Sequence, residues 1–360
     1  MATPAPVPVI VLAGYLGAGK TTLLNQVLRQ PGARIGVIVN DFGDINIDAG
    51  LVAGQIDRPA SIAGGCLCCI EDVSELDEAL EQLSAPRLAL DAIIVEASGL
   101  ADPVALAQLI RDRPSEHARL AAVVDVVDAV EHFGTVDDGG LPPLRYQVAS
   151  LVVVNKLDRL ADNERESIVE RIRARVRERN TRAEVVGAVG GRIDAALLFD
   201  VAHPEEDPGQ LPLRDLLIEA AASGNPLPGH EHDHVHAHAA TATSEGAVDA
   251  ARVLAALERP VRGAYRMKGH FAVHTAGGAR GFTANAVGGY LHLVERRPPK
   301  QNVLVAIGVD LDESAARAAL DAALAPADSE PHGPSVMRLE RHVRLSGGGE
   351  ESEGASSASF

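Results

Sequence analysis

Aromatic residues are scarce in this sequence of 360 residues. They make up 3% of the chain, and tryptophan is absent, which argues against a protein that stacks nucleic-acid bases on aromatic side chains. Acidic residues outnumber basic ones, and the net charge of −17 argues against general binding to a polyanion. We therefore expect no nucleic-acid partner.

Two further absences concern membranes and disulfides. No apolar run approaches the roughly 20 residues that a membrane-spanning helix requires, and Met1 to Pro8 lacks the basic start and apolar core of a secretory signal. These features predict a cytoplasmic protein without a membrane partner. All three cysteines lie within residues 66–69, a poor framework for disulfides that points instead to metal or redox chemistry.

The apolar content is sufficient for more than one core. Hydrophobic residues make up 46% of the chain, and its length allows two domains. In the first half, apolar runs of strand length alternate with helical patterns, which predicts an α/β domain with a mostly parallel sheet flanked by helices. The expected strands cover 7–12, 34–39, 90–95, 120–127, 151–154 and 183–186. The expected helices cover 21–28, 71–83 and 162–179, with a further helix capped by Asp102-Pro103.

The first strand leads into a phosphate-binding loop. The residues from Gly14 to Thr21 read GYLGAGKT and fit the pattern G-x-x-x-x-G-K-[ST], in which glycines let backbone N–H groups approach a triphosphate. Lys20 would reach the β- and γ-phosphates as a candidate catalytic residue, and Thr21 would offer its hydroxyl to Mg²⁺. The candidate nucleotide-binding residues here are Gly14, Gly17, Ala18, Gly19, Lys20, Thr21 and Thr22.

Polar segments follow two later strands. The segment 40–48 carries three aspartates; Asp41 is a candidate catalytic residue near the γ-phosphate, the alternative being an acidic surface loop. Glu96 would take part in catalysis and bind Mg²⁺, and Gly99 would offer its backbone N–H to the γ-phosphate. Because the carboxyl ends of parallel strands form the ligand site in this fold class, these residues should meet at the phosphate-binding loop.

The sequence Asn155-Lys156-Leu157-Asp158 predicts which base is bound. The Asp158 carboxylate can accept hydrogen bonds from the ring N–H and the exocyclic amine of guanine, whereas adenine would leave it unpaired. Asn155 and Lys156 would brace the loop and cover the base. The expected nucleotide is therefore GTP, with a last guanine-contacting loop within 187–191.

Cys66, Cys68 and Cys69 place three thiols within four residues. Thiolates suit Zn²⁺, Cu⁺ or Co²⁺. A fourth ligand must come from elsewhere, or the site stays open, which favours transient binding of a cargo metal. A buried structural cysteine cluster and a redox switch are the alternatives.

Histidines concentrate in the proline-rich segment 201–247. Interleaved with acids, they cannot form a packed core, so we predict a flexible linker that binds Zn²⁺, Ni²⁺ or Co²⁺ with low affinity, the alternative being a merely solvated linker. The candidate ligands are His230, His232, His234, His236 and His238.

The segments on either side of this linker are predicted to be separate domains. The nucleotide-binding domain covers 1–200, a smaller α+β domain covers 248–345, and a Gly/Ser/Glu-rich tail at 346–360 is predicted to be disordered. In the smaller domain we expect helices at 248–257 and 313–324, and strands at 261–275, 280–287, 290–294, 303–308 and 335–345.

Together these motifs resemble the CobW-like metallochaperone GTPases, which share a class with the nickel-insertion GTPases of urease and hydrogenase maturation. The resemblance rests on the segments 14–21, 40–44, 65–69, 96–103, 155–158, 266–269 and 307–311. It implies a phosphate-loop GTPase domain followed by a CobW-type carboxyl-terminal domain. The chain departs from the family pattern in carrying Asp41 and Asp44 where glutamates are more usual. We also find no cysteine-containing docking motif for a eukaryotic client.

The resemblance implies that the chain hydrolyses GTP with Mg²⁺ and that its cysteines hold Zn²⁺, or Co²⁺, for a metal-requiring client protein. Loss of the γ-phosphate would relax the flanking loops and release the metal. A homo-oligomer is compatible with the sequence. Two alternatives stay open: a regulatory GTPase with a cysteine redox sensor, and an activator dedicated to one cobalt or iron enzyme.

Overall fold

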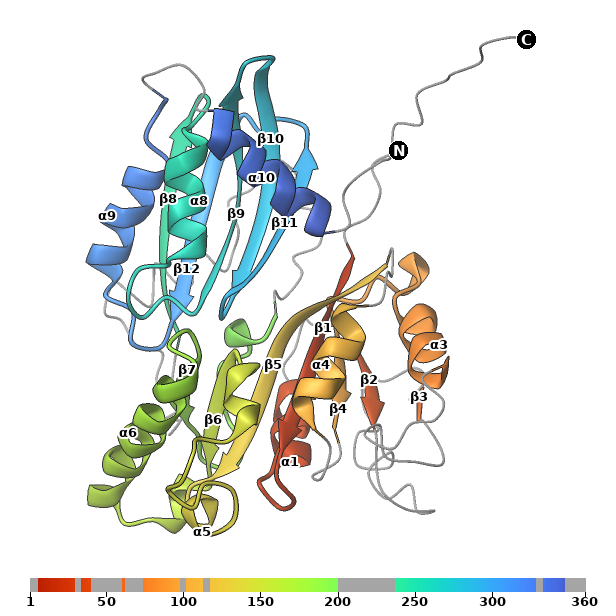
Figure 1. Cartoon of the computed structure of the whole chain (residues 1–360), viewed down its shortest axis with the longest axis vertical. Coiled ribbons are helices and arrows are strands. Elements are labelled where there is room, and N and C mark those ends of the chain that lie inside the picture. Colours follow the sequence, from red (N-terminus) through yellow and green to blue (C-terminus); the bar gives the residue numbers. More distant parts are fainter. Residues whose placement is uncertain are drawn as a thin grey trace, which may run out of the picture.

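The computed structural model describes the backbone of most of both domains. The described residues are 6–29, 34–39, 60–61, 74–97, 102–112, 117–199, 237–327 and 333–346. They form two domains that lie one above the other along the long axis of the molecule (Figure 1). None of the described helices combines the length and apolar character needed to cross a bilayer.

The amino-terminal domain is built on a sheet of seven strands in the order β3-β2-β4-β1-β5-β6-β7, and every neighbouring pair is parallel. Its central strands are Val/Ile/Leu runs buried on both faces, the pattern of a parallel sheet covered by helices. The strands are β1 (Val7–Gly14), β2 (Ile35–Val39), β3 (Ala60–Ser61), β4 (Ala92–Glu96), β5 (Ala118–Asp128), β6 (Leu151–Asn155) and β7 (Glu184–Gly187). All six predicted strands are confirmed, and β3 is additional.

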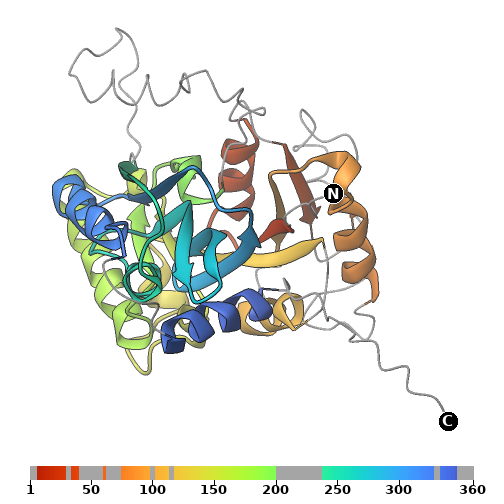
Figure 2. The same cartoon turned by 90° about the horizontal axis from the view of Figure 1, so that it is seen from above.

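Helices cover both faces of this sheet (Figures 1 and 2). The α-helices are α1 (Lys20–Leu28), α3 (Ser74–Leu83), α4 (Pro103–Arg111), α5 (His132–Thr135) and α6 (Asp162–Arg179). The short 3₁₀ helices are η2 (Pro86–Leu88), η3 (Leu144–Gln147), η4 (Leu157–Arg159) and η5 (Ala195–Leu197). One face packs against α1 and η5, and the other against α3, α4 and α6. Asp102 caps α4 as predicted, because its carboxylate accepts a hydrogen bond from the Val104 N–H at 2.9 Å.

The second domain is a five-stranded antiparallel sheet in the order β11-β10-β9-β12-β8. Its strands are β8 (His238–Glu245), β9 (Arg266–Thr275), β10 (Gly278–Val287), β11 (Tyr290–Arg296) and β12 (Gln301–Gly308). Its helices are α8 (Ala250–Glu258), α9 (Glu313–Ala323) and α10 (Gly333–Leu345). All three helices bury apolar side chains against one face of the sheet. The predicted α+β character is therefore confirmed.

Two elements of this domain differ from the prediction. The last one, predicted as a strand at 335–345, is the helix α10; that prediction was wrong because Val336, Leu339 and Val343 repeat at the helical spacing and face the core. The strand β8 occupies residues assigned to the linker. Its buried residues are alanines alternating with threonines, a pattern too weakly apolar to be recognised as a strand.

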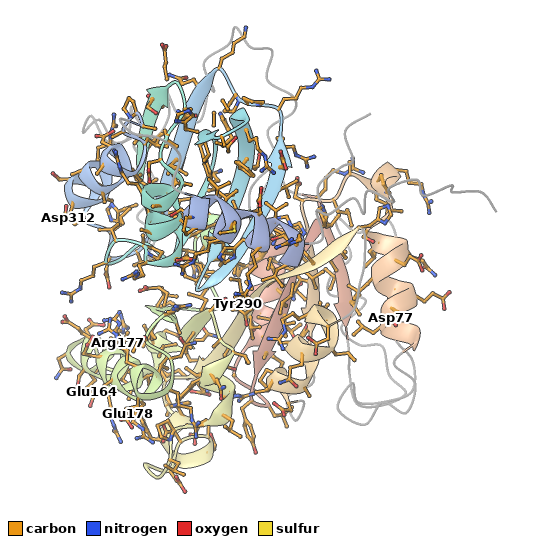
Figure 3. All side chains as sticks on the ribbon, turned by 45° about the horizontal axis from the view of Figure 1, so that its top comes forward. Asp77, Glu164, Arg177, Glu178, Tyr290 and Asp312 are labelled. Atoms are coloured by element: carbon orange, nitrogen blue, oxygen red, sulfur yellow. The ribbon has the colours of Figure 1, made fainter. Side chains whose placement is uncertain are left out.

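The domains meet at the amino-terminal edge of the parallel sheet. The Tyr290 hydroxyl donates to the Val148 carbonyl oxygen at 3.1 Å, and the hydroxyls of Tyr265 and Ser150 lie 3.3 Å apart. Val148 and Ser150 immediately precede β6, and Figure 3 shows Tyr290 at this junction. The second domain thus contacts the edge opposite the carboxyl ends of the strands, where the phosphate-binding loop lies.

Candidate nucleotide-binding site

The loop between β1 and α1 depends on glycine at two positions. Gly19 has a φ of +102°, and a Cβ there would lie 2.3 Å from Asn155 Nδ2. At Gly14, with a φ of +151°, a Cβ would lie 2.4 Å from the Val126 carbonyl oxygen. Any side chain at these positions would collide with β5 or β6, so only glycine permits this path. The loop ends at the first turn of α1, whose backbone N–H groups and helix dipole favour phosphate.

Lys20, Thr21 and Glu96 come together beside this loop. Lys20 Nζ donates to the Gly14 carbonyl oxygen at 3.1 Å, and the side chain is buried. Thr21 Oγ1 donates to Glu96 Oε1 at 2.9 Å, although the two residues are 75 positions apart. Glu96 ends β4, which pairs with β1, and this brings the carboxylate to the start of α1. A hydroxyl and a carboxylate in contact are hard oxygen donors and fit Mg²⁺.

Asn155 links three loops at the carboxyl-terminal edge. Its Nδ2 donates to the Ala18 carbonyl oxygen at 3.0 Å, and its Oδ1 accepts from the Gly191 N–H at 2.9 Å. The side chain is 2% exposed. Asn155 therefore connects the phosphate-binding loop to the segment 187–191, where the last guanine-contacting loop was expected.

Lys156 and Asp158 follow directly. Lys156 Nζ lies 2.6 Å from Asp128 Oδ2, at the end of β5. A pocket of about 260 Å³ opens between this ion pair and the outer side of the phosphate-binding loop. Asp158 lies within η4, and its side chain is exposed. Asp128 is an additional polar residue of this site that was not predicted, although its position at the carboxyl end of a buried strand is a signal for one.

A buried ion pair lies beneath the loop on β5. Asp125 is 0% exposed and its Oδ2 lies 3.4 Å from Arg145 Nε. Burial raises the pKa of the Asp125 carboxyl, and the cations of Arg145 and Lys20 offset this only in part. The sequence did not predict this pair, because the residues around Asp125 in its apolar strand do not indicate which distant side chain will lie next to it.

A second buried polar group lies next to the pocket. His132 Nε2 and the Tyr146 hydroxyl lie 2.6 Å apart, and Asp137 is held by two hydrogen bonds from Arg175 at 2.9 and 2.8 Å. Burial lowers the pKa of His132 to about 4, against the opposing effect of Asp137. His132 is therefore neutral at physiological pH. This group was not predicted from the sequence either, because its members meet only through the fold.

The structure brings together only part of the predicted site. Lys20, Thr21, Glu96 and Asn155 surround the phosphate-binding loop, as described above. His238 does not lie in a linker: it begins β8, and its Nδ1 is 2.9 Å from Glu313 Oε1. The predicted residues outside the described part of the chain are Asp41, Cys66, Cys68, Cys69, Gly99, His230, His232, His234 and His236.

Metal-binding side chains do not cluster within the part of the chain that the structure describes. Among the described residues, no group of three or more His, Cys, Asp or Glu side chains could hold a metal ion. The predicted cargo cysteines belong to the connection from β3 to α3. A cargo site formed by these cysteines would therefore lie between β3 and α3 along the chain.

Several known proteins are similar to this chain. The zinc chaperone YjiA of Escherichia coli (strain K12) is 32% identical over 202 residues, which cover 54% of this chain and 61% of YjiA. The zinc-regulated GTPase metalloprotein activator 1 of Schizosaccharomyces pombe is 30% identical over 199 residues, 52% of this chain and 47% of that protein. The chain thus spans less than two thirds of the length of these relatives. The crystal structure of Zn(II)-bound YjiA GTPase from E. coli covers 88% of this chain, with 24% identity and a TM-score of 0.38.

Two family models match in succession. Residues 8–186 match the CobW/HypB/UreG nucleotide-binding domain, and residues 237–324 match the cobalamin synthesis protein cobW carboxyl-terminal domain. The two matched segments correspond to the parallel and the antiparallel sheet. With a phosphate-binding loop, an N-K-x-D loop and a CobW-type second domain in this order, the chain belongs to the CobW family.

Proposed function

We propose that this protein is a GTP-hydrolysing metallochaperone that binds Zn²⁺ at Cys66, Cys68 and Cys69 and delivers it to a client protein under the control of GTP. The observation that carries this proposal is the contact of Thr21 with Glu96 beside the phosphate-binding loop. Its metal half is supported by the three thiols within four residues and by relatives named zinc chaperone and zinc-regulated GTPase metalloprotein activator.

At the phosphate end, Lys20 binds the β- and γ-phosphates as a point charge. Thr21 and Glu96 would hold Mg²⁺, which when bound neutralises charge on the β- and γ-oxygens. Asp41 and Gly99 would act on the γ-phosphate side, Gly99 through its backbone N–H. With its ammonium already directed across the loop to the Gly14 carbonyl oxygen, Lys20 needs little rearrangement to reach a phosphate.

At the base end, Asp158 accepts hydrogen bonds from guanine, which excludes adenine because the carboxylate would then stay unpaired. Asn155 keeps the base loop and the phosphate loop in a fixed relation through its bond to the Ala18 carbonyl oxygen. Lys156 covers the base. Base recognition and phosphate binding are thereby parts of one connected unit.

The sheet register supports a coupling between nucleotide and cargo metal. Ser61 of β3 pairs with Val39 of β2, and Val39 pairs with Glu96 of β4. Two strand spacings, about 10 Å, therefore separate the backbone of Ser61 from that of Glu96. Cys66 follows Ser61 by five residues along the chain. Loss of the γ-phosphate would change the surroundings of the Mg²⁺ that Glu96 would help to hold, relax this edge of the sheet and weaken binding of the metal by the thiolates.

The remaining histidines would have a supporting role. His230, His232, His234 and His236 would bind metal with low affinity and raise its local concentration. Because they would mask a cysteine site, the decisive experiment removes them first, by changing all four to alanine. This background protein is then compared with the same protein carrying Cys66→Ser, Cys68→Ser and Cys69→Ser.

Zinc stoichiometry and affinity are measured by competition with a chromophoric chelator, once with a non-hydrolysable GTP analogue and once with GDP. We expect the background protein to bind one Zn²⁺ tightly with the analogue and more weakly with GDP, and the serine variant to bind none tightly. Equal zinc affinity of the two proteins would overturn the cargo site. Turnover that is insensitive to Zn²⁺ but lost on peroxide treatment would favour a regulatory GTPase with a redox sensor.

A further inference from the structure

Lys156 adopts a backbone conformation that non-glycine residues rarely take. Its φ is 65° and its ψ is 30°, in the left-handed region. The residue stands between Asn155, the last residue of β6, and η4, which contains Asp158. The direction in which the chain presents Asp158 therefore depends on this one turn.

An ion pair holds the Lys156 side chain at the edge of a pocket. Lys156 lines the pocket of about 260 Å³ together with Gly17 and Ala18 of the phosphate-binding loop, so one side of it adjoins open space. Lys156 Nζ lies 2.6 Å from Asp128 Oδ2, and the two side chains are 20% and 13% exposed. Such a short, partly buried and charge-assisted contact is stronger than a surface ion pair.

Asp128 is itself held rigidly. Its Oδ1 accepts hydrogen bonds from the Val130 N–H at 2.9 Å and from the Glu131 N–H at 3.3 Å. The parallel register places Asp128 beside Asn155, next to Lys156. Burial raises the pKa of the Asp128 carboxyl, but the hydrogen bonds from Lys156 and from these two N–H groups outweigh burial and hold the pKa below its usual range.

We propose that Asp128 is a positioning residue for base recognition, which holds the turn at Lys156 and thereby orients Asp158 toward guanine. This inference rests on the proposed role of Asp158 in reading guanine. The neighbouring Asn155 is engaged on its other side by Ala18 and Gly191. The base-reading loop is thus fixed at two points, by Asn155 to the phosphate loop and by Lys156 to β5.

The substitution Asp128→Asn separates the two tasks of this side chain. Asparagine keeps an oxygen that accepts from the Val130 and Glu131 N–H groups, but it removes the negative charge opposite Lys156. Affinities for GDP and for IDP, which lacks the exocyclic amine, are measured by isothermal titration. We expect the affinity for GDP to fall roughly tenfold, as for the loss of one charge-assisted hydrogen bond. The affinity for IDP should fall less, so that the preference for GDP over IDP shrinks.

Glu131→Gln is the matched control. Glu131 lies on the same turn and lines the same pocket, but only its backbone N–H contacts Asp128. This variant should keep both affinities within about twofold of wild type, as for other surface substitutions. A double-mutant cycle with Lys156→Met adds a second readout. If Asp128 acts only through Lys156, the double variant should bind GDP no more weakly than the weaker-binding of the two single variants.

The variant Asp158→Ala distinguishes failure of the base-reading role of Asp158 from failure of the positioning role of Asp128. If this variant keeps the wild-type preference for GDP over IDP, the base-reading role itself is wrong. If Asp158→Ala abolishes the preference and Asp128→Asn leaves it intact, only the positioning role is overturned. Equal losses of GDP and IDP affinity in Asp128→Asn, or strictly additive effects with Lys156→Met, would likewise contradict it.

Discussion

The two edges of the parallel sheet are built from different kinds of contact. At the carboxyl-terminal edge, Lys20, Glu96 and Asn155 are buried, and each depends on a polar partner from another element. At the amino-terminal edge, where the second domain packs, the contacts include hydrogen bonds of the neutral Tyr265 and Tyr290 hydroxyls. A longer ion pair also joins the domains, with Arg173 Nη2 3.5 Å from Asp310 Oδ2. The difference indicates that one edge holds charged groups in a defined orientation and the other attaches a domain.

Buried ionisable groups reinforce this contrast. Asp125, His132 and Asp137 are at most 1% exposed, and His132 lines the same pocket as residues of the phosphate-binding loop. Burying such groups costs free energy unless they are paired or neutral. Substitutions at the carboxyl-terminal edge should therefore change nucleotide binding and turnover or the pH dependence of stability. Substitutions in the second domain or at the junction should change only stability, without a change in nucleotide binding or turnover.

The largest effect is expected for Lys20→Ala. Removing the ammonium that binds the β- and γ-phosphates should lower GTP turnover by about 100-fold or more, as for loss of one preorganised donor to developing charge. Phosphate release at saturating GTP and thermal unfolding are measured in parallel. Lys300→Ala, at an exposed position of the second domain, is the control and should keep full turnover. Turnover of Lys20→Ala within twofold of wild type would contradict the assignment of the loop.

The next effect tests the second domain. Leu339 of α10 is 0% exposed, so Leu339→Ala should leave a cavity and cost about 3 kcal/mol of unfolding free energy. Met337→Ala, on the same helix but 61% exposed, is the matched control and should change stability little. Urea unfolding measures both, and GTP turnover at low urea should be unaffected. A loss of turnover in Leu339→Ala would show that the two edges are not independent.

A pH-dependent effect is expected at His132. The folded-state pKa of about 4 lies below the ordinary value, so its contribution to stability is complete above about pH 6.5 and is lost as the pH falls toward 4. Between pH 7.5 and pH 5 this amounts to about 2 kcal/mol.

The measurement compares urea unfolding of wild type and His132→Asn at the two pH values. Burial also lowers the pKa of His292 in the second domain, to about 3, and that contribution is common to both proteins. His132→Asn should therefore lose less stability on acidification than wild type. Identical losses in the two proteins would mean that His132 is not held neutral in the folded state.

The smallest effect is expected at the junction. Tyr290→Phe removes the hydroxyl that donates to the Val148 carbonyl oxygen and should cost about 1 kcal/mol of stability. Nucleotide affinity should not change, because this contact lies at the opposite edge from the phosphate-binding loop. A change in GDP affinity beyond about threefold, which corresponds to roughly 0.7 kcal/mol, would show that the junction and the nucleotide site are coupled.

Most elements of the fold could be predicted because their patterns are strong. The strands β1, β4 and β6 are uninterrupted apolar runs, and α6 has the predicted bounds. The prediction failed where apolar residues were few: β8 buries only alanines, and α10 has three apolar contacts within thirteen residues. In such segments packing against the rest of the domain selects the conformation, since the intrinsic propensities of these residues for helix and for strand differ little.

The sequence alone was sufficient to predict the motifs whose functional residues are neighbours along the chain. The loop from Gly14 to Thr21 and the tetrapeptide from Asn155 to Asp158 were recognisable because each motif is defined by residue types at fixed spacing within a short segment. Only the tertiary structure decided which distant residues meet. Thr21 contacts Glu96, and Lys156 contacts Asp128. These contacts follow from the order and register of parallel strands, and strand order is a property of the whole core that no local pattern of residues encodes.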